Sequence, residues 1–536
     1  MDKLARLGRR LPPGTIRIGI AVDSLTIEAW KVSLLKFLLS DPAIQVAAIF
    51  SLEKPQQERP GLLFGAYERW SSKVAAPERL VNFSPETADI PVVRLPGRAD
   101  ELDQDDRARI AQEHLDVLIW LGRRPHGECR GLAHFGVWSL CLGDPGRVQF
   151  KPAYFSDAYR GEVISELFLL VHRESFSNAA VERHSAATQE GWHITRRPIE
   201  PLKAAAPMIL RYLLDLLEFG PEYFSTRLSR CEEMTCADDG RYPNTWTLVH
   251  HLWRQAMRSI RIRLRDRGRK LRWFIAIRSD RQNFTNSRDH FSATGLHEIS
   301  NQRESQEADP FVVDSRGRTF LFLEEVPNAT DRGHISCREI SDGSSVSAPT
   351  RIIAQPYHLS YPFVLFDGAD FFMLPESSAN ATVELYRAVN FPYEWRLEQV
   401  LQNEVSLVDT TPFFHNGTWY FFTTAAETGE ALLYYSDRLS GEWRYHRSNP
   451  ICSDVRRARG AGALFFRRGK LIRPAQDCSV RYGYAITLNE ITDLTPDSYA
   501  ERLVETIPPK WARGLLGTHT LNATEHIEVL DGLRMR

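Results

Sequence analysis

Long apolar runs are missing from this 536-residue sequence, and cysteine is scarce. No stretch approaches the roughly 18 to 20 apolar residues that a membrane-spanning helix needs. Residues 1–13 are basic but lead into a strand-like run, where a signal peptide would have an apolar region and a cleavage site. The seven cysteines are odd in number and scattered, so they imply no disulfide framework. These absences predict a cytoplasmic protein.

An excess of charge of either sign is also missing. The 67 basic and 68 acidic side chains give no global steering toward nucleic acid, which is not an expected partner. Cys231 and Cys236 form a close pair, but no second pair or nearby histidine completes a zinc set. Asp103-Gln-Asp105 matches an acid pair for a metal-bound nucleotide sugar, yet its acid-rich surroundings are typical of a helix start. We expect neither a metal nor another cofactor.

The first part of the chain alternates strand and helix patterns. Residues 17–22, 44–50 and 115–121 are short apolar runs, and residues 27–39 have helical spacing. Such alternation predicts a parallel α/β sheet that is covered on both faces. Because a chain of this length favours two or three domains, we place the first domain at residues 1–200.

The same region resembles the N-terminal domain of the formyltransferase-like family, which includes methionyl-tRNA and sugar formyltransferases. The stretches LDVLIWLG and GLAHFGVWSLCLGDP carry the resemblance, which implies a Rossmann-like domain. The family uses an Asn and a His near this point and a downstream Asp. Here the Asn position reads as Ser139 and the His position as Cys141 or Leu142. Ser and Leu cannot perform the required acid–base chemistry, so we expect a retained fold without formyl transfer.

Residues 201–271 are predicted to form a helical, basic linker. The basic run 254–272 comprises Arg254, Arg258, Arg261, Arg263, Arg265, Arg267, Arg269, Lys270 and Arg272. This run suits an anionic surface, either membrane phospholipid or a phosphorylated substrate. The alternative is a solvated helix whose arginines pair with acidic surface elsewhere. Nucleic acid is disfavoured because no aromatic interleaving accompanies the charge.

The region 307–477 repeats one pattern four times: a Phe, a short turn with Gly, and an aromatic-rich alternating run. The first phenylalanines are Phe311, Phe363, Phe413 and Phe465, at intervals of 52, 50 and 52 residues. A period near fifty residues with hairpin chemistry predicts a β-propeller. About one further blade of sequence remains at the two ends. Residues 272–536 therefore predict a five-bladed propeller with one blade assembled from both ends of the domain.

Acidic residues stand at corresponding places in these repeats. Asp309 and Asp409 precede the first and third Phe, and Glu376 ends a second strand. Innermost strands line the axial channel of a propeller, so we expect these acids to face one another, and two carboxylates suffice for glycosyl chemistry. The pattern resembles the five-bladed glycoside hydrolases of the arabinanase and β-xylosidase type. That resemblance implies Asp309 as the base and Glu376 and Asp409 as the other catalytic acids, with acid types exchanged relative to the family order.

A closer resemblance covers roughly residues 272–536. The motifs ADPFVV, HLSYPFVL, PESSANATVELYRA, VDTTPFF, DVRRARGAGALF and RPAQDCSVRYG are similar to the N-terminal propeller domain of plant glucosamine inositolphosphorylceramide transferases and their bacterial relatives. In the plant proteins the recognised glycosyltransferase domain is a separate C-terminal unit. The resemblance therefore implies the propeller fold but not transferase activity.

Seven further residues are expected to bind substrate in the channel. They are His358, Tyr361, Arg456, Arg459, Arg473, Gln476 and Asp477. Arginines that interrupt an inner strand fit bidentate recognition of carboxylate or phosphate. For His358 and Tyr361, a capped turn is the structural alternative. The expected ligand is a glycan, a sugar phosphate or a glycolipid.

The sequence thus predicts a carbohydrate-active enzyme that cleaves or transfers a glycosyl unit in the propeller channel, in glycan or glycolipid metabolism. One alternative is a non-catalytic scaffold that binds a glycan or glycolipid. A weaker alternative is a sugar formyltransferase. Close spacing of the three acids would favour catalysis, whereas pairing of each acid with an arginine would favour the scaffold.

Overall fold

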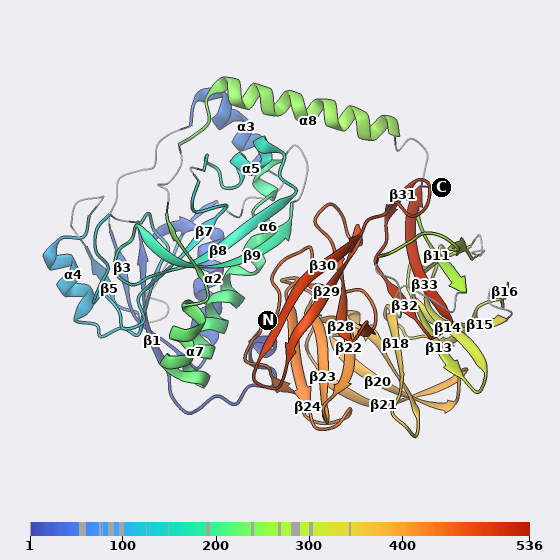
Figure 1. The fold of residues 1–536 in the computed structure, drawn as a ribbon. Coiled ribbons are helices and arrows are strands. Elements are labelled where there is room, and N and C mark those ends of the chain that lie inside the picture. The colour runs from blue at the N-terminus through green and yellow to red at the C-terminus, as the bar shows by residue number, and fades with distance from the viewer. Residues whose placement is uncertain are drawn as a thin grey trace. The chain divides into compact units, whose positions relative to one another are not determined.

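The structure is a computed structural model, and the chain divides into two compact units (Figure 1). One unit contains Arg9–Ile262, and the other combines Lys3–Gly8 with Arg263–Arg536. The structure describes residues 2–52, 60–73, 77, 79–83, 90–95, 101–124, 126–147, 149–188, 193–236, 241–265, 270–279, 290–299, 304–341 and 345–535.

The first unit is built on an eight-stranded mixed sheet of order β10-β9-β8-β7-β6-β1-β3-β5. Its strands are β1 (Ile16–Val22), β3 (Ile44–Ser51), β5 (Val92–Arg94), β6 (Val117–Trp120), β7 (Val137–Leu142), β8 (Ile164–His172), β9 (Asn178–Ala187) and β10 (Glu232–Thr235). The apolar runs of the sequence form β1, β3 and β6, which pair in parallel. An all-parallel sheet was expected, but β8 and β9 are antiparallel because the turn at 173–177 is too short for a crossover.

Helices accompany this sheet. They are α2 (Ala29–Ser40), α3 (Leu62–Ser72), α4 (Gln104–Ala111), α5 (Phe155–Arg160), α6 (Ile199–Lys203), α7 (Ala205–Leu228) and α8 (Thr245–Arg265), and the short strands β2 (Thr26–Glu28) and β4 (Leu80–Asn82) form a separate pair. Asp103 is the N-cap of α4, where its side chain accepts a hydrogen bond from Asp106 N. Helix α7 is largely buried. It kinks at Gly220, which has a φ of 78° and is followed by Pro221. The segment expected as a linker therefore contributes α7 and β10 to the first unit. Among the described residues, no helix has the length and apolarity to cross a membrane.

The second unit is a five-bladed β-propeller, as the repeats predict. Its first three blades are the sheets β13 (Ser305–Ser315) to β17 (Thr350–Ile353), β18 (Ser360–Phe366) to β21 (Glu394–Asn403), and β22 (Leu407–His415) to β25 (Arg444–Tyr445). The fourth blade contains β26 (Arg459–Gly460), β27 (Phe465–Arg467), β28 (Lys470–Asp477), β29 (Ala485–Leu494) and β30 (Tyr499–Ile507). Two of the phenylalanines that repeat along the chain, Phe311 and Phe363, pack between the first and second blades, with ring centroids 5.6 Å apart.

The fifth blade closes the ring from both ends of the propeller sequence. It contains β11 (Leu271–Ser279), β12 (His297–Glu298), β31 (Leu515–Gly517), β32 (Leu521–Ala523) and β33 (Ile527–Met535). Strand β11 pairs with β33 in antiparallel register over its whole length. The pairing sets Arg278 opposite Glu528, and the two buried side chains form an ion pair at 2.7 Å. Backbone pairing between β11 and β33 and a buried ion pair between their side chains therefore both close the ring.

The start of the chain also belongs to the propeller unit. Helix α1 (Asp2–Arg6) precedes Gly8, whose carbonyl accepts a hydrogen bond of 2.8 Å from Tyr445 N in the third blade. Gly8 has a φ of 71°, and a Cβ at this position would lie 2.7 Å from Tyr445 N. This close approach of two backbones requires glycine.

Candidate functional site

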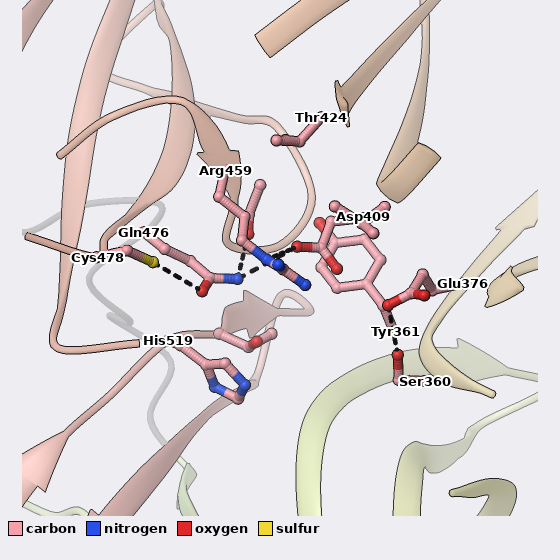
Figure 2. A network of polar contacts seen from close by, with 12 residues as sticks. Ser360, Tyr361, Glu376, Asp409, Thr424, Arg459, Gln476, Cys478 and His519 are labelled. Atoms are coloured by element: carbon pink, nitrogen blue, oxygen red, sulfur yellow. Dashed lines mark hydrogen bonds and ion pairs between the residues drawn. The ribbon is translucent and has the colours of Figure 1, made fainter. Parts of the chain in front are cut away.

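The innermost strands of the first three blades share one distortion near their start. Asp309, Tyr361 and Asp409 have positive φ values of 49°, 43° and 52°. At each of them the antiparallel pairing with the next strand shifts its register, which marks a β-bulge. Non-glycine residues rarely adopt this conformation, and such residues cluster at functional sites. Figure 2 shows Tyr361 and Asp409 converging with Arg459 and Gln476 from different strands.

Asp309 is held by donors from two other blades. Its Oδ1 accepts a hydrogen bond of 2.7 Å from Thr520 Oγ1, and its Oδ2 accepts one of 3.1 Å from Tyr361 N. His519 Nε2 lies 3.5 Å from Oδ1. Burial raises the pKa of Asp309, and the neighbouring His519 opposes this effect.

His519 lies between two carboxylates. Its Nδ1 contacts the carboxylate of Asp531, and its ring stacks on Trp273 at a centroid distance of 4.0 Å. Burial by itself lowers the pKa of His519, but the negative charges of Asp531 and Asp309 outweigh burial and raise the pKa to about 9. The imidazole is therefore a cation at neutral pH. Asp309, His519 and Asp531 also offer ligand atoms within 4.8 Å of one another, the spacing of a cation site, and a metal that bound there would displace the proton of the imidazole.

Asp409 is paired with the fourth blade. Its Oδ2 accepts hydrogen bonds from Arg459 Nε at 2.7 Å and from Gln476 Nε2 at 3.3 Å (Figure 2). Burial raises the pKa of Asp409 to about 7 even though the Arg459 guanidinium lowers it, and the charges of Glu376 and Asp309 add to the rise. Asp409 is thus a carboxyl group that exchanges a proton near neutral pH.

Tyr361 connects the two aspartates. Its backbone N–H donates to Asp309, while its hydroxyl lies 2.8 Å from Thr411 Oγ1 and accepts a hydrogen bond of 2.9 Å from Gly462 N. The side chain is fully buried. Tyr361 therefore links four blades around the axis, and its role as a sugar contact stays a prediction.

Glu376 and His358 lie nearer the solvent. Glu376 accepts a hydrogen bond of 2.9 Å from Ser360 Oγ (Figure 2). It accepts a second hydrogen bond from Ser378 Oγ. His358 Nε2 lies 2.8 Å from Glu324 Oε1, and this hydrogen bond raises the pKa of His358. Burial raises the pKa of Glu324.

We define the axial site as Asp309, Tyr361, Glu376, Asp409, Arg459, Gln476 and His519. Asp309 and Asp409 are 4% and 3% exposed, so they form a buried layer. Arg459 is partly exposed, and its guanidinium lies 4.8 Å from the ring centroid of the exposed Tyr482. The site thus combines buried carboxyls with an accessible cation and an aromatic ring, groups that suit an anionic sugar.

Three residues expected to bind substrate have other partners. Arg473 is buried in a bidentate ion pair with Glu501, with N–O distances of 2.8 and 2.7 Å. Arg456 binds Asp454 in the same way, and Asp477 accepts a hydrogen bond from Ser479 N in a turn. We therefore leave these three residues out of the axial site.

Sequence reasoning missed several functional candidates. His519, Thr520 and Asp531 lie in the closing blade, outside the four sequence repeats. Glu324 ends a second strand in the first blade, at the place that Glu376 takes in the second blade. The position of Glu324 in the repeat could therefore have identified it as a candidate, whereas His519 lies in no repeat motif.

The residues that resemble the formyltransferase positions lie inside the first unit. Ser139 Oγ is 2.9 Å from His172 Nε2, and both residues are buried on neighbouring strands. Burial lowers the pKa of His172 to about 4, so the imidazole is neutral at physiological pH. The thiol of Cys141 faces Gly143 O at 3.5 Å.

Comparison with known proteins confirms the resemblance of the propeller. Residues 296–529 match the family model described as glucosamine inositolphosphorylceramide transferase 1, N-terminal. Glucosamine inositolphosphorylceramide transferase 1 of Oryza sativa subsp. japonica is 34% identical over 203 residues, which are 36% of this chain and 27% of that protein. The Arabidopsis thaliana protein of the same name is also 34% identical over 203 residues, 26% of its length. The chain spans about a quarter of the length of these curated relatives.

Solved structures with similarity to the chain include two glycoside hydrolases. Zg3597, a family 117 glycoside hydrolase of Zobellia galactanivorans, is 13% identical with a TM-score of 0.32, over 49% of this chain and 90% of that chain. RS223-Beta-xylosidase is also 13% identical with a TM-score of 0.32, over 38% of this chain and 79% of that chain.

Proposed function

We propose that the axial site cleaves or transfers a glycosyl unit of a glycan, sugar phosphate or glycolipid. Glycosyl chemistry needs one protonated and one ionised carboxyl group. Asp409, with a pKa of about 7, supplies the proton in this proposal. Asp309, beside the imidazolium of His519, is the base or nucleophile. One observation carries the proposal. Asp309 and Asp409 lie in corresponding β-bulges of two blades, and both belong to one connected network of polar contacts.

The substrate class rests on the accessible part of the site. Arg459 offers a guanidinium, and His358 is half-buried with a raised pKa, so both suit a phosphate group. The relatives that match this region are named glucosamine inositolphosphorylceramide transferases. A phosphate-bearing glycolipid therefore heads the candidate substrates, with Glu376 as a third carboxyl that contacts the sugar.

A second candidate is a scaffold that binds the same ligands without chemistry. The near-complete burial of Asp309 and Asp409 favours it, as does the pairing of each aspartate with a cation. In this case the ligand contacts only the accessible residues, which are His358, Glu376, Arg459 and Tyr482. For the first unit, we propose a formyltransferase-like fold without formyl transfer, because Ser139 and Cys141 or Leu142 stand where that family has an Asn and a His.

The test combines binding and turnover on three variants. Nucleotide sugars, phosphoinositol glycans and simple pentosides are titrated by calorimetry into wild type, Asp309→Asn and Asp409→Asn. Asp437→Asn is the matched control, since Asp437 also pairs with an arginine but is well exposed in a turn. The enzyme reading predicts retained binding and a loss of turnover of at least about 100-fold in both aspartate variants.

Three outcomes separate the readings. Turnover lost in the aspartate variants but kept in Asp437→Asn supports catalysis. Ligand binding with no turnover in any protein, wild type included, supports the scaffold. Wild-type turnover that survives both substitutions would show that the axial aspartates are not the catalytic groups.

A further inference from the structure

Helix α8 has an apolar face that its own unit leaves uncovered. Its most exposed apolar side chains are Trp246, Val249, Trp253 and Ile260, at 81%, 47%, 60% and 49%. Their spacing of three, four and seven residues places them on one side of a helix. Two exposed tryptophans in one stripe mark an interaction surface, because soluble proteins seldom expose such side chains together. Figure 1 shows α8 as one continuous helix.

Other faces of α8 hold the helix on its unit. Leu248 is buried in a cluster that includes Phe64, Tyr67 and Phe155. The buried His251 packs against Phe155 with ring centroids 5.1 Å apart, and Arg254 donates a hydrogen bond of 2.6 Å to Tyr159 O. These contacts fix the orientation of α8, so the exposure of the stripe follows from the fold.

The charge of α8 identifies the kind of partner. No aspartate or glutamate occurs from 245 to 265, whereas Arg254, Arg258, Arg261, Arg263 and Arg265 do. Arg254 and Arg258 are exposed; the side chains at 261–265 and residues 266–269, which include Arg267 and Arg269, lie outside the described part. A second copy of this helix would bring like charges together, which is unfavourable. An anionic surface satisfies both the arginines and the tryptophans.

We propose that α8 is an interfacial helix that binds an anionic lipid surface. The stripe Trp246, Val249, Trp253 and Ile260 enters the headgroup region, and the net positive charge of the helix attracts it to anionic lipids. The helix lies along the membrane and does not cross it. This binding involves no residue of the axial site, so it stands or falls independently of the proposed chemistry.

The test is sedimentation of the full chain with phosphatidylcholine vesicles, with or without phosphatidylserine. Wild type should bind the mixed vesicles, and salt should weaken this binding. Trp246→Ser/Trp253→Ser should reduce affinity at least roughly tenfold by removing the apolar anchors. The tryptophan fluorescence of wild type should shift to the blue on binding.

The control removes exposed apolar side chains elsewhere. Val389 and Leu397 are exposed on β20 (Thr382–Asn390) and β21 of the propeller unit, so Val389→Ser/Leu397→Ser should bind as wild type does. Circular dichroism verifies that every variant keeps its helix content. Equal vesicle binding by wild type and the tryptophan variant overturns the proposal. So does a wild-type dimer that ignores vesicles and dissociates in the tryptophan variant, because a second copy then covers the stripe.

Discussion

Arg459 donates from Nε to Oδ2 of Asp409 at 2.7 Å and thereby joins the third and fourth blades at the axis. Although this guanidinium favours the carboxylate, burial raises the pKa of Asp409 to about 7. Asp409 therefore changes charge near neutral pH. Both the stability of the propeller and the proposed chemistry should depend on this titration.

The first prediction concerns stability. Asp409 has an ordinary pKa of 3.8 in the unfolded chain and about 7 in the folded chain. Its favourable contribution is therefore complete below pH ~4 and is lost as the pH rises to ~7. Asp409→Asn cannot titrate, so its free energy of unfolding relative to wild type should rise across this window by up to about 4 kcal/mol. Urea denaturation at several pH values measures the difference; a constant offset would contradict a raised pKa.

The second prediction concerns turnover. If Asp409 donates the proton, kcat/KM for a glycosyl substrate should fall as the pH rises above ~7. The residual activity of Asp409→Asn should not show this decrease of kcat/KM at high pH, while Asp437→Asn should keep the wild-type pH profile. If the decrease persists unchanged in Asp409→Asn, another group donates the proton.

The third prediction compares two acid–arginine pairs in the propeller. Glu501 and Arg473 are both almost fully buried, whereas Asp437 is well exposed and its partner Arg444 is partly exposed. Glu501→Gln should cost about 3–5 kcal/mol of unfolding free energy, because a buried guanidinium loses its counter-ion. Asp437→Asn should cost less than about 1 kcal/mol. Thermal or urea denaturation tests both, and similar costs would show that Arg473 does not depend on its ion pair.

The fourth prediction concerns ring closure. Arg278→Met and Glu528→Leu should each destabilise the protein by about 3–5 kcal/mol, because each leaves a buried charge unpaired. The double substitution should cost far less than the two single costs combined. Glu298→Gln, whose partner Arg534 also lies in this blade but is partly exposed, should cost less than about 1 kcal/mol. Additive costs for Arg278 and Glu528 would mean that the pair contributes no coupling.

The sequence was sufficient for the propeller because each blade repeats the same hairpin and alternation. The intervals between Phe311, Phe363, Phe413 and Phe465 predicted a propeller, and the sequence left at the two ends of the domain predicted a fifth blade. Strands β11 and β33 from the two ends pair in this blade. The first unit was partly predictable: β1, β3 and β6 coincide with continuous apolar runs. The antiparallel β8 and β9 were not expected, since a strand pattern alone does not give the direction of pairing.

The site was predictable only where the repeats apply. Asp309 and Asp409 were expected from their places before Phe311 and Phe413, and the structure brings both into one network. The partner of Arg473 could not be foreseen, because β28 and β30 are separated by β29 and a bulge at Leu488/Asn489 shifts the register. Such a shift turns side chains to the other face of the sheet. The catalytic and binding roles themselves stay predictions.

The hydrogen bond between Tyr445 and Gly8 has a consequence for how the chain is assembled. Because Lys3–Gly8 and Arg263–Arg536 form one unit, the α/β unit is an insertion within a discontinuous propeller unit. Residues 3–8 are synthesised before the third blade and must wait for it, while Arg9–Ile262 can complete its core in the meantime. A fragment that starts at residue 263 would therefore lack part of its own unit, whereas a chain that joins Gly8 directly to Arg263 would keep both parts.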